Sequence, residues 1–77
     1  MLVAPTLCVV TPNGAAIRAI REARELDLRR LAHLIGKSPG YLSRVETGKR
    51  GAADGTLTRI AEELRVPLEA ILKGERP

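Results

Sequence analysis

The thirteen lysine and arginine side chains of this 77-residue chain are unevenly distributed. The whole chain has a formal net charge of +4. Between residues 29 and 50 a single acid, Glu46, opposes six basic residues, which are Arg29, Arg30, Lys37, Arg44, Lys49 and Arg50, whereas the segments on either side are close to neutral. A solvated surface without a partner would mix the two signs. A cluster of one sign indicates a face that binds a polyanion such as nucleic acid.

Residues that could carry out catalysis or hold a metal are scarce. The sequence has one cysteine, Cys8, and one histidine, His33, whereas a structural zinc site draws four ligands mainly from these two types. His33 has no recognisable nucleophile or orienting group as a partner, and we expect it to face solvent. The sequence therefore predicts no enzyme activity, no metal and no cofactor. Cys8 is expected to be a reduced thiol, with an intermolecular disulfide as the alternative.

The elements that position the basic residues are predicted to be helices. Apolar residues make up 44% of the chain, but Tyr41 is its only aromatic residue. A core of leucine, isoleucine, valine and alanine favours packed helices, because strands are usually rich in aromatic and β-branched residues. The length allows one domain, predicted over residues 13–75. Residues 1–12 are uncharged and predict an apolar tail, either a short edge strand or a dimer contact, that is too short to span a membrane.

Hydrophobic periodicity and capping residues predict five helices, at about residues 14–25, 28–35, 39–47, 56–65 and 67–73. Asn13 or Thr11 is the expected N-cap of the first helix, and Ser38 followed by Pro39 is a strong start for the third. Gly36 and Gly48 are expected to end the second and third helices. In the first helix, Ile17, Ile20 and Ala23 are expected to face the core.

The stretch from Asp27 to Arg50, DLRRLAHLIGKSPGYLSRVETGKR, is predicted to form two helices joined by a tight turn that contains Gly36. This arrangement is typical of the helix-turn-helix unit, whose second helix can enter the major groove of DNA. Over residues 14–73 the helix boundaries and turn residues resemble the Cro/phage-repressor (XRE-type, lambda-repressor-like) helix-turn-helix family. The resemblance implies an all-α fold, a five-helix lambda-repressor-like domain that follows the apolar tail.

The same resemblance implies which residues contact DNA. It assigns base reading to the start and middle of the third helix and the residue before its cap, namely Lys37, Pro39, Gly40, Tyr41 and Arg44. It assigns contacts with the DNA backbone to Arg29, Ser38, Ser43, Thr47, Lys49 and Arg50. It also implies a structural brace between Arg21 and Glu46.

Two residues depart from the polar side chains that many relatives have at these positions. Pro39 and Gly40 offer no side-chain hydrogen bond, so direct readout would depend mainly on Arg44, which can bind guanine through two hydrogen bonds. Gly40 would let the helix approach the groove closely. Specificity would then depend more on the shape and deformability of the DNA.

The resemblance implies a sequence-specific, double-stranded DNA-binding transcriptional regulator, a phage- or plasmid-type repressor that blocks a promoter by occupying an operator. Because one such module makes a small interface, we expect a homodimer on a palindromic operator, joined through the fifth helix or the tail. The alternatives are an antitoxin or other protein-interaction module on the same fold, and a restriction-modification controller protein. The expected location is the cytoplasm of a bacterial cell or phage-infected host, with no membrane partner and no small-molecule ligand.

Overall fold

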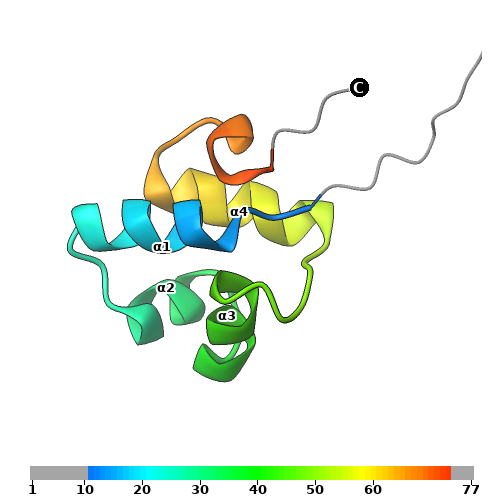
Figure 1. Ribbon diagram of the computed structural model, residues 1–77. Helices are drawn as coiled ribbons and strands as arrows, with labels where there is room; N and C mark the ends of the chain where they lie inside the picture. Colours follow the sequence, from blue (N-terminus) through cyan, green and yellow to red (C-terminus); the bar gives the residue numbers. More distant parts are fainter. Residues whose placement is uncertain (1–10, 74–77) are drawn as a thin grey trace, which may run out of the picture.

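The computed structural model describes residues 11–73, so Cys8 and most of the tail, for which an edge strand or a dimer contact was predicted, lie outside the described residues. The elements are α1 (Gly14–Ala23), α2 (Leu28–Leu34), α3 (Pro39–Glu46), α4 (Asp54–Leu64) and a 3-10 turn, η1 (Leu68–Ile71). Figure 1 shows α2 and α3 together on one side of α1 and α4, with η1 on the opposite side. No helix within residues 11–73 is long and apolar enough to cross a membrane.

The first and fourth helices differ from their predicted bounds. α1 ends at Ala23, because Glu25 has a left-handed backbone (φ 57°) that reverses the chain. α4 begins at Asp54, two residues before its predicted start, and the carboxylate in its first turn suits the helix dipole. Ala23 is exposed, contrary to the prediction, whereas Arg21 is buried. A helix has 3.6 residues per turn, so residues spaced three apart move progressively away from the inner face, and Ala23 becomes exposed. Arg21 lies four residues after the buried Ile17 and so stays on the inner face.

The fifth α-helix was predicted wrongly, because Leu68–Ile71 forms only a 3-10 turn. The chain is extended at Leu72 (φ −109°, ψ 152°), so the helix cannot continue to Lys73. Leu72 instead forms an isolated antiparallel bridge with Pro12, and the amide of Lys73 donates to the carbonyl of Thr11 at 2.9 Å. This pairing joins the two ends of the described chain.

α2 and α3 both end in a Schellman motif, in which a left-handed residue reverses the chain and the next amide bonds back to the helix. The left-handed residues are the predicted ones, Gly36 (φ 73°) and Gly48 (φ 80°). The amide of Lys37 donates back to α2 at 2.9 Å, and the amide of Lys49 donates back to α3 at 2.8 Å. The residues that follow each helix therefore lie against its last turn.

Every element contributes to the aliphatic core, whose fully buried members are Ile17, Leu31, Ala32, Leu42, Val45, Leu57, Ile60, Leu64 and Ile71. Two helices approach each other closely at Gly14, the first residue of α1. A Cβ placed there would lie 2.4 Å from the carbonyl oxygens of Val45 and Glu46. Only glycine allows the start of α1 to meet the end of α3 at this distance, and this contact sets the position of α3.

Replacing Gly14 with alanine should destabilise the domain by about 1–3 kcal/mol or more, because the added carbon meets backbone that cannot rotate away. Urea unfolding measures the change. Gly55→Ala in α4 is the matched control, since its Cβ would meet nothing within 4 Å and helix propensity should make this variant up to about 1 kcal/mol more stable. Equal effects at the two positions would contradict the close contact.

Candidate nucleic-acid interface

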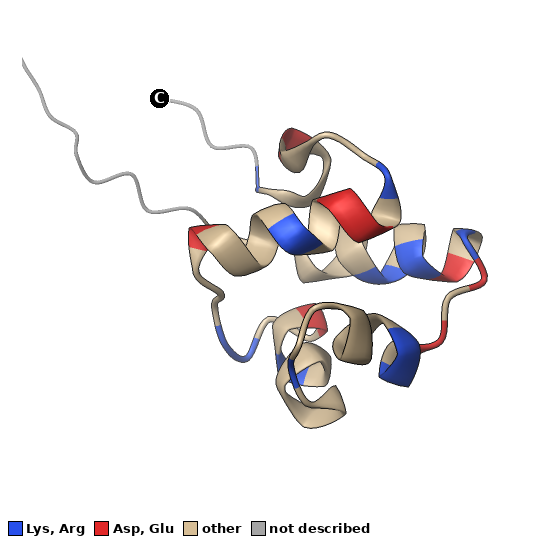
Figure 2. Cartoon of the chain, turned by 180° about the vertical axis from the view of Figure 1, so that it is seen from behind, with Lys and Arg blue, Asp and Glu red and all other residues tan. Residues whose placement is uncertain are grey.

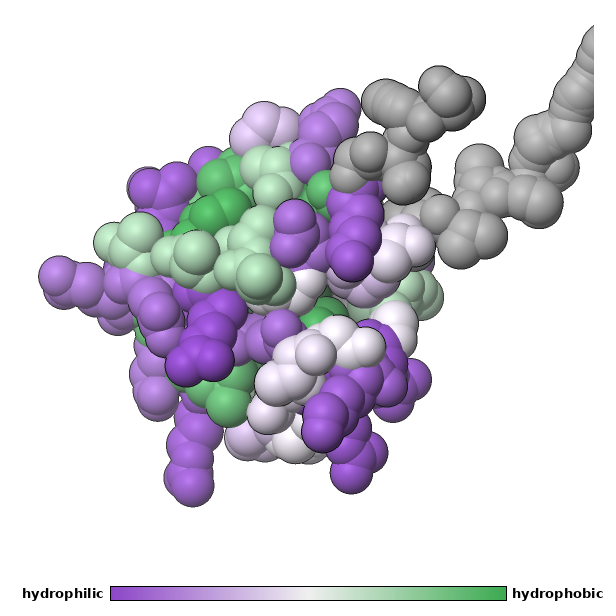
Figure 3. All heavy atoms as spheres, in the orientation of Figure 1, coloured by the Kyte–Doolittle hydropathy of each residue, from purple (hydrophilic) through white to green (hydrophobic). Residues whose placement is uncertain are grey.

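The residues predicted to contact DNA lie on the outer surface of α2, α3 and the adjoining loops. Ten of them are exposed, which are Arg29, Lys37, Ser38, Pro39, Gly40, Ser43, Arg44, Thr47, Lys49 and Arg50, and Tyr41 is half-buried. Figure 2 shows basic segments at the start of α2, in the turn before α3 and in the loop after it. In Figure 3 the half of the molecule formed by α2 and α3 is mostly hydrophilic or neutral, whereas green side chains gather over the other half. The exposed surface has the chemistry of a polyanion site.

Ser38 and Thr47, at the two ends of α3, differ in what they can offer a phosphate. The Ser38 Oγ accepts a hydrogen bond from the amide of Tyr41 at 3.1 Å, which leaves its hydroxyl proton for a phosphate oxygen. The Thr47 Oγ1 donates to the carbonyl oxygens of Ser43 at 3.0 Å and Arg44 at 3.2 Å. The hydroxyl proton of Thr47 is therefore already used within its own helix.

The exposed start of α3 presents backbone rather than polar side chains. Pro39 is the first residue of the helix, and Gly40 follows it. A Cβ placed at Gly40 would meet nothing within 4 Å, so packing within the described residues does not require glycine there. A glycine in a helix costs about 0.5–1 kcal/mol relative to alanine. Gly40 is the second residue of α3, where only part of this cost applies, and packing leaves room there for a larger residue.

Tyr41 is in contact with two cations that the sequence did not indicate as its partners. The Arg50 guanidinium carbon lies 4.4 Å from the ring centroid, and the Lys37 ammonium nitrogen lies 5.2 Å from it. Both distances are within the range of cation–π attraction. Lys37 precedes α3 and Arg50 follows it, so the ring links the two ends of the helix.

Arg21 and Glu46 form the ion pair that the resemblance implied. The Arg21 Nε donates to Glu46 Oε2 at 2.7 Å and its Nη2 donates to Oε1 at 3.2 Å, while Nη1 donates to the carbonyl of Leu26 at 2.8 Å. Each residue is only 9% exposed. The hydrogen bond to Glu46 raises the pKa of Arg21 above its ordinary value, so the arginine stays charged at any physiological pH. The pair ties α1 to the last turn of α3.

Arg24 is a structural residue that sequence reasoning missed. Its Nε donates to the carbonyl of Leu64 at 2.8 Å, and its Nη2 donates to that of Arg65 at 3.4 Å. These carbonyls belong to the end of α4, where a positive charge also suits the helix dipole. No local pattern pairs Arg24 with a helix end forty residues later in the chain.

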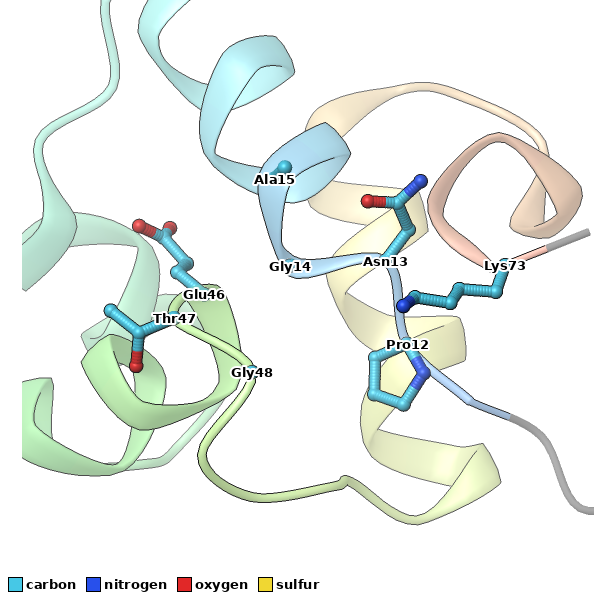
Figure 4. A pocket seen from close by; sticks show the side chains of 8 residues that line it. All are labelled: Pro12, Asn13, Gly14, Ala15, Glu46, Thr47, Gly48 and Lys73. Carbon is cyan, nitrogen blue, oxygen red and sulfur yellow. The ribbon is translucent and has the colours of Figure 1, made fainter.

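An open pocket of about 230 Å³ lies where the start of α1 meets the end of α3. Its lining comes from three segments, Pro12–Ala15, Glu46–Gly48 and Lys73, as Figure 4 shows. Within the described residues, no three histidine, cysteine, aspartate or glutamate side chains gather as metal ligands. The pocket lies between the ends of two helices. The basic residues of the candidate interface do not line it.

Residues 17–71 match the helix-turn-helix family HTH_3. The chain belongs to this family. The HTH-type transcriptional repressor RghR of Bacillus subtilis is 40% identical over 60 residues, which are 77% of this chain and 44% of RghR. The chain spans less than half the length of the curated relatives it matches, with 41–46% of each covered.

Solved structures of the same lambda-repressor-like fold superpose on this domain. The clp gene regulator ClgR from Corynebacterium glutamicum has a TM-score of 0.71 and 34% identity over 73% of this chain and 60% of that chain. The restriction-modification controller protein C.AhdI from Aeromonas hydrophila has a TM-score of 0.71 and 28% identity over 74% of this chain and 86% of that chain. These likenesses agree with the helix-turn-helix geometry of α2 and α3.

The buried ion pair gives a stability prediction. Replacing Arg21 with methionine leaves the Glu46 carboxylate buried without a partner, and such a loss typically costs about 3–5 kcal/mol. The double variant Arg21→Met/Glu46→Leu should recover most of that loss, because no charge is then stranded. Urea unfolding of both variants is the measurement.

The exposed pair Arg18–Glu22, whose side chains are 61% and 56% exposed, supplies the control. Arg18→Ala should cost about 0.5 kcal/mol or less. A cost for Arg21→Met as small as that of the control would show that the Arg21–Glu46 pair does not hold α3.

Proposed function

We propose that this domain binds double-stranded DNA sequence-specifically and acts as a transcriptional repressor by occupying an operator. The observation that carries the proposal is the exposed basic surface of α2, α3 and the loop after α3. In this helix-turn-helix, α3 packs against the core through one face only and exposes the others. RghR, which is named a transcriptional repressor, supports the same function. More specifically, we propose that it is a phage- or plasmid-type repressor and that it is located in the cytoplasm.

In the proposed complex α3 lies in the major groove. Arg44 is exposed in the last turn of α3 and reads guanine through its O6 and N7 acceptors. The Ser38 hydroxyl and the basic side chains Arg29 and Lys49 bind phosphates and set the register of the helix on the duplex. The domain performs no catalysis in this role.

A homodimer on a palindromic operator is part of the proposal. A single module buries about 600–1,000 Å² on DNA, which is little for specific binding at physiological salt. The half-buried apolar side chains of Leu68 and Leu72, in and after η1, support a dimer contact in this region. The two half-sites should lie about 10–10.5 base pairs apart, one turn of the duplex.

A restriction-modification controller is the second candidate, and the likeness to C.AhdI favours it. A reporter gene placed under the selected operator separates the two roles, because a repressor only lowers transcription whereas a controller also raises it. An antitoxin or protein-interaction module is the remaining alternative. It predicts that the purified chain alone binds no DNA sequence preferentially.

Selection of bound duplexes from a random pool tests the proposed function. We expect an enriched palindrome with half-sites about one turn apart. Neutralisation of about five phosphates predicts that log K falls with log salt with a slope near −4 to −5. Binding that follows salt alone, without any enriched sequence, would refute sequence-specific recognition.

Arg44 and Lys49 should contribute to binding in different ways. Arg44→Ala should cost about 1–3 kcal/mol of binding free energy and relax the preference at one base pair. Lys49→Ala should weaken binding to all duplexes alike and reduce the salt slope by about one. Titration of operator variants at several salt concentrations separates the two effects, and an unchanged ranking with Arg44→Ala would remove its base-reading role.

Gly40 should show opposite effects on folding and on binding. Gly40→Ala should stabilise the free domain by up to about 1 kcal/mol, because α3 gains helix propensity and the added carbon meets open space. The same carbon should weaken operator binding, because it holds the backbone of α3 away from the groove. Thermal unfolding and a binding titration of one preparation give both numbers, and unchanged or tighter binding would show that Gly40 is not needed for close approach.

A further inference from the structure

Two basic residues from different segments meet at the ring of Tyr41. Lys37 follows the left-handed Gly36 at the end of α2, and Arg50 comes two residues after the left-handed Gly48 at the end of α3. The reversal at Gly48 brings Arg50 back toward α3, whereas Lys37 lies against the end of α2, two residues before α3 begins. The ring of Tyr41 therefore receives one cation from before the helix and one from after it, at 5.2 Å and 4.4 Å.

The backbone around Arg50 holds it in this position. Its amide donates to the carbonyl of Arg44 at 3.3 Å, and the amide of Lys49 donates to the same carbonyl at 2.8 Å. The Arg50 Nε donates to the carbonyl of Gly51 at 3.2 Å, which leaves both terminal nitrogens of the guanidinium for a ligand. Arg50 is thus fixed at its main chain, at its Nε and by the ring.

Lys37 and Arg50 are exposed and each places a positive charge beside the ring, so this part of the surface favours a negatively charged ligand. A phosphate group within reach of both side chains would accept charge-assisted hydrogen bonds from each of them. Holding the side chains in place beforehand reduces the entropy that binding must otherwise remove.

We propose that Tyr41 is a positioning residue that gathers Lys37 and Arg50 into a paired cation site for one phosphate of the DNA backbone. This inference rests on the proposed function and moves both Tyr41 and Lys37 from base reading to a contact with the DNA backbone. The ring contributes affinity through the two cations, whereas a base-reading tyrosine would contribute sequence preference. The hydroxyl group of Tyr41 has no part in this role.

Two substitutions at Tyr41 separate the roles. Tyr41→Leu removes the π face and should weaken binding to the operator and to unrelated duplexes alike, by about 5- to 30-fold. Tyr41→Phe keeps the ring and should change binding by less than about 2-fold. Once Tyr41→Leu is present, Arg50→Ala should add little, because the two side chains act together. A reordered ranking of operator variants with Tyr41→Leu, or wild-type affinity, would overturn the proposal.

A second measurement needs no DNA. Tyr41 is the only tyrosine and the chain has no tryptophan, so intrinsic fluorescence reports on this ring alone. Inorganic tripolyphosphate should change the fluorescence of the wild type, and Arg50→Ala or Lys37→Ala should raise its dissociation constant about 5-fold or more. Arg59→Ala, at an exposed arginine of α4, is the matched control and should leave the titration unchanged.

The two measurements distinguish failure of this inference from failure of the proposed function. A wild-type chain that responds to tripolyphosphate but selects no duplex would refute sequence-specific DNA recognition while keeping the paired cation site. A chain that selects an operator but shows no response, or the same response in Arg50→Ala as in the wild type, would refute the site while keeping the function.

Discussion

The ion pair between Arg21 and Glu46 decides how α3 can be held by the domain and still leave most of its surface open. Leu42 and Val45 are the fully buried apolar side chains of α3, which is a narrow attachment for a helix. Two hydrogen bonds from Arg21 in α1 to Glu46 in the last turn of α3 strengthen this narrow apolar attachment and fix its direction. The pair also affects the electrostatic potential at the surface. Glu46 is the one acid between residues 29 and 50, and its charge is neutralised inside the molecule. The exposed surface of that segment therefore carries positive charge alone.

Much of the local structure could be predicted from the sequence because it depends on neighbours in the chain. Asn13 accepts a hydrogen bond from the amide of Ala16 at 3.1 Å and Ser38 accepts one from the amide of Tyr41 at 3.1 Å, as expected of N-caps. Gly36 has the left-handed backbone that only glycine adopts without strain. Which face of α3 is exposed likewise follows from its helical period, so the exposure of the candidate base-reading residues could be predicted from the sequence.

The rest depends on contacts between residues far apart in the chain. Nothing near Gly14 indicates that the carbonyls of α3 will lie 2.4 Å from its missing Cβ. Glu25 and Arg65 take left-handed backbone conformations, with φ of 57° and 62°, that their residue types disfavour. The stacking of Arg50 on Tyr41 requires both the reversal after α3 and the loop geometry that follows it. Sequence reasoning named the basic residues of the candidate interface but could not show which of them lie beside Tyr41.

The small number of side chains on α3 that are proposed to read bases is an argument for the proposed dimer. One arginine bonded to guanine discriminates against a wrong base by about 1–3 kcal/mol. Specific binding by such domains typically exceeds non-specific binding by about 4–10 kcal/mol. With Pro39 and Gly40 unable to add side-chain hydrogen bonds, a single Arg44 falls short of this difference. Two copies on a two-fold site would double its contribution, and a close approach at Gly40 would let the shape of the groove supply the remainder.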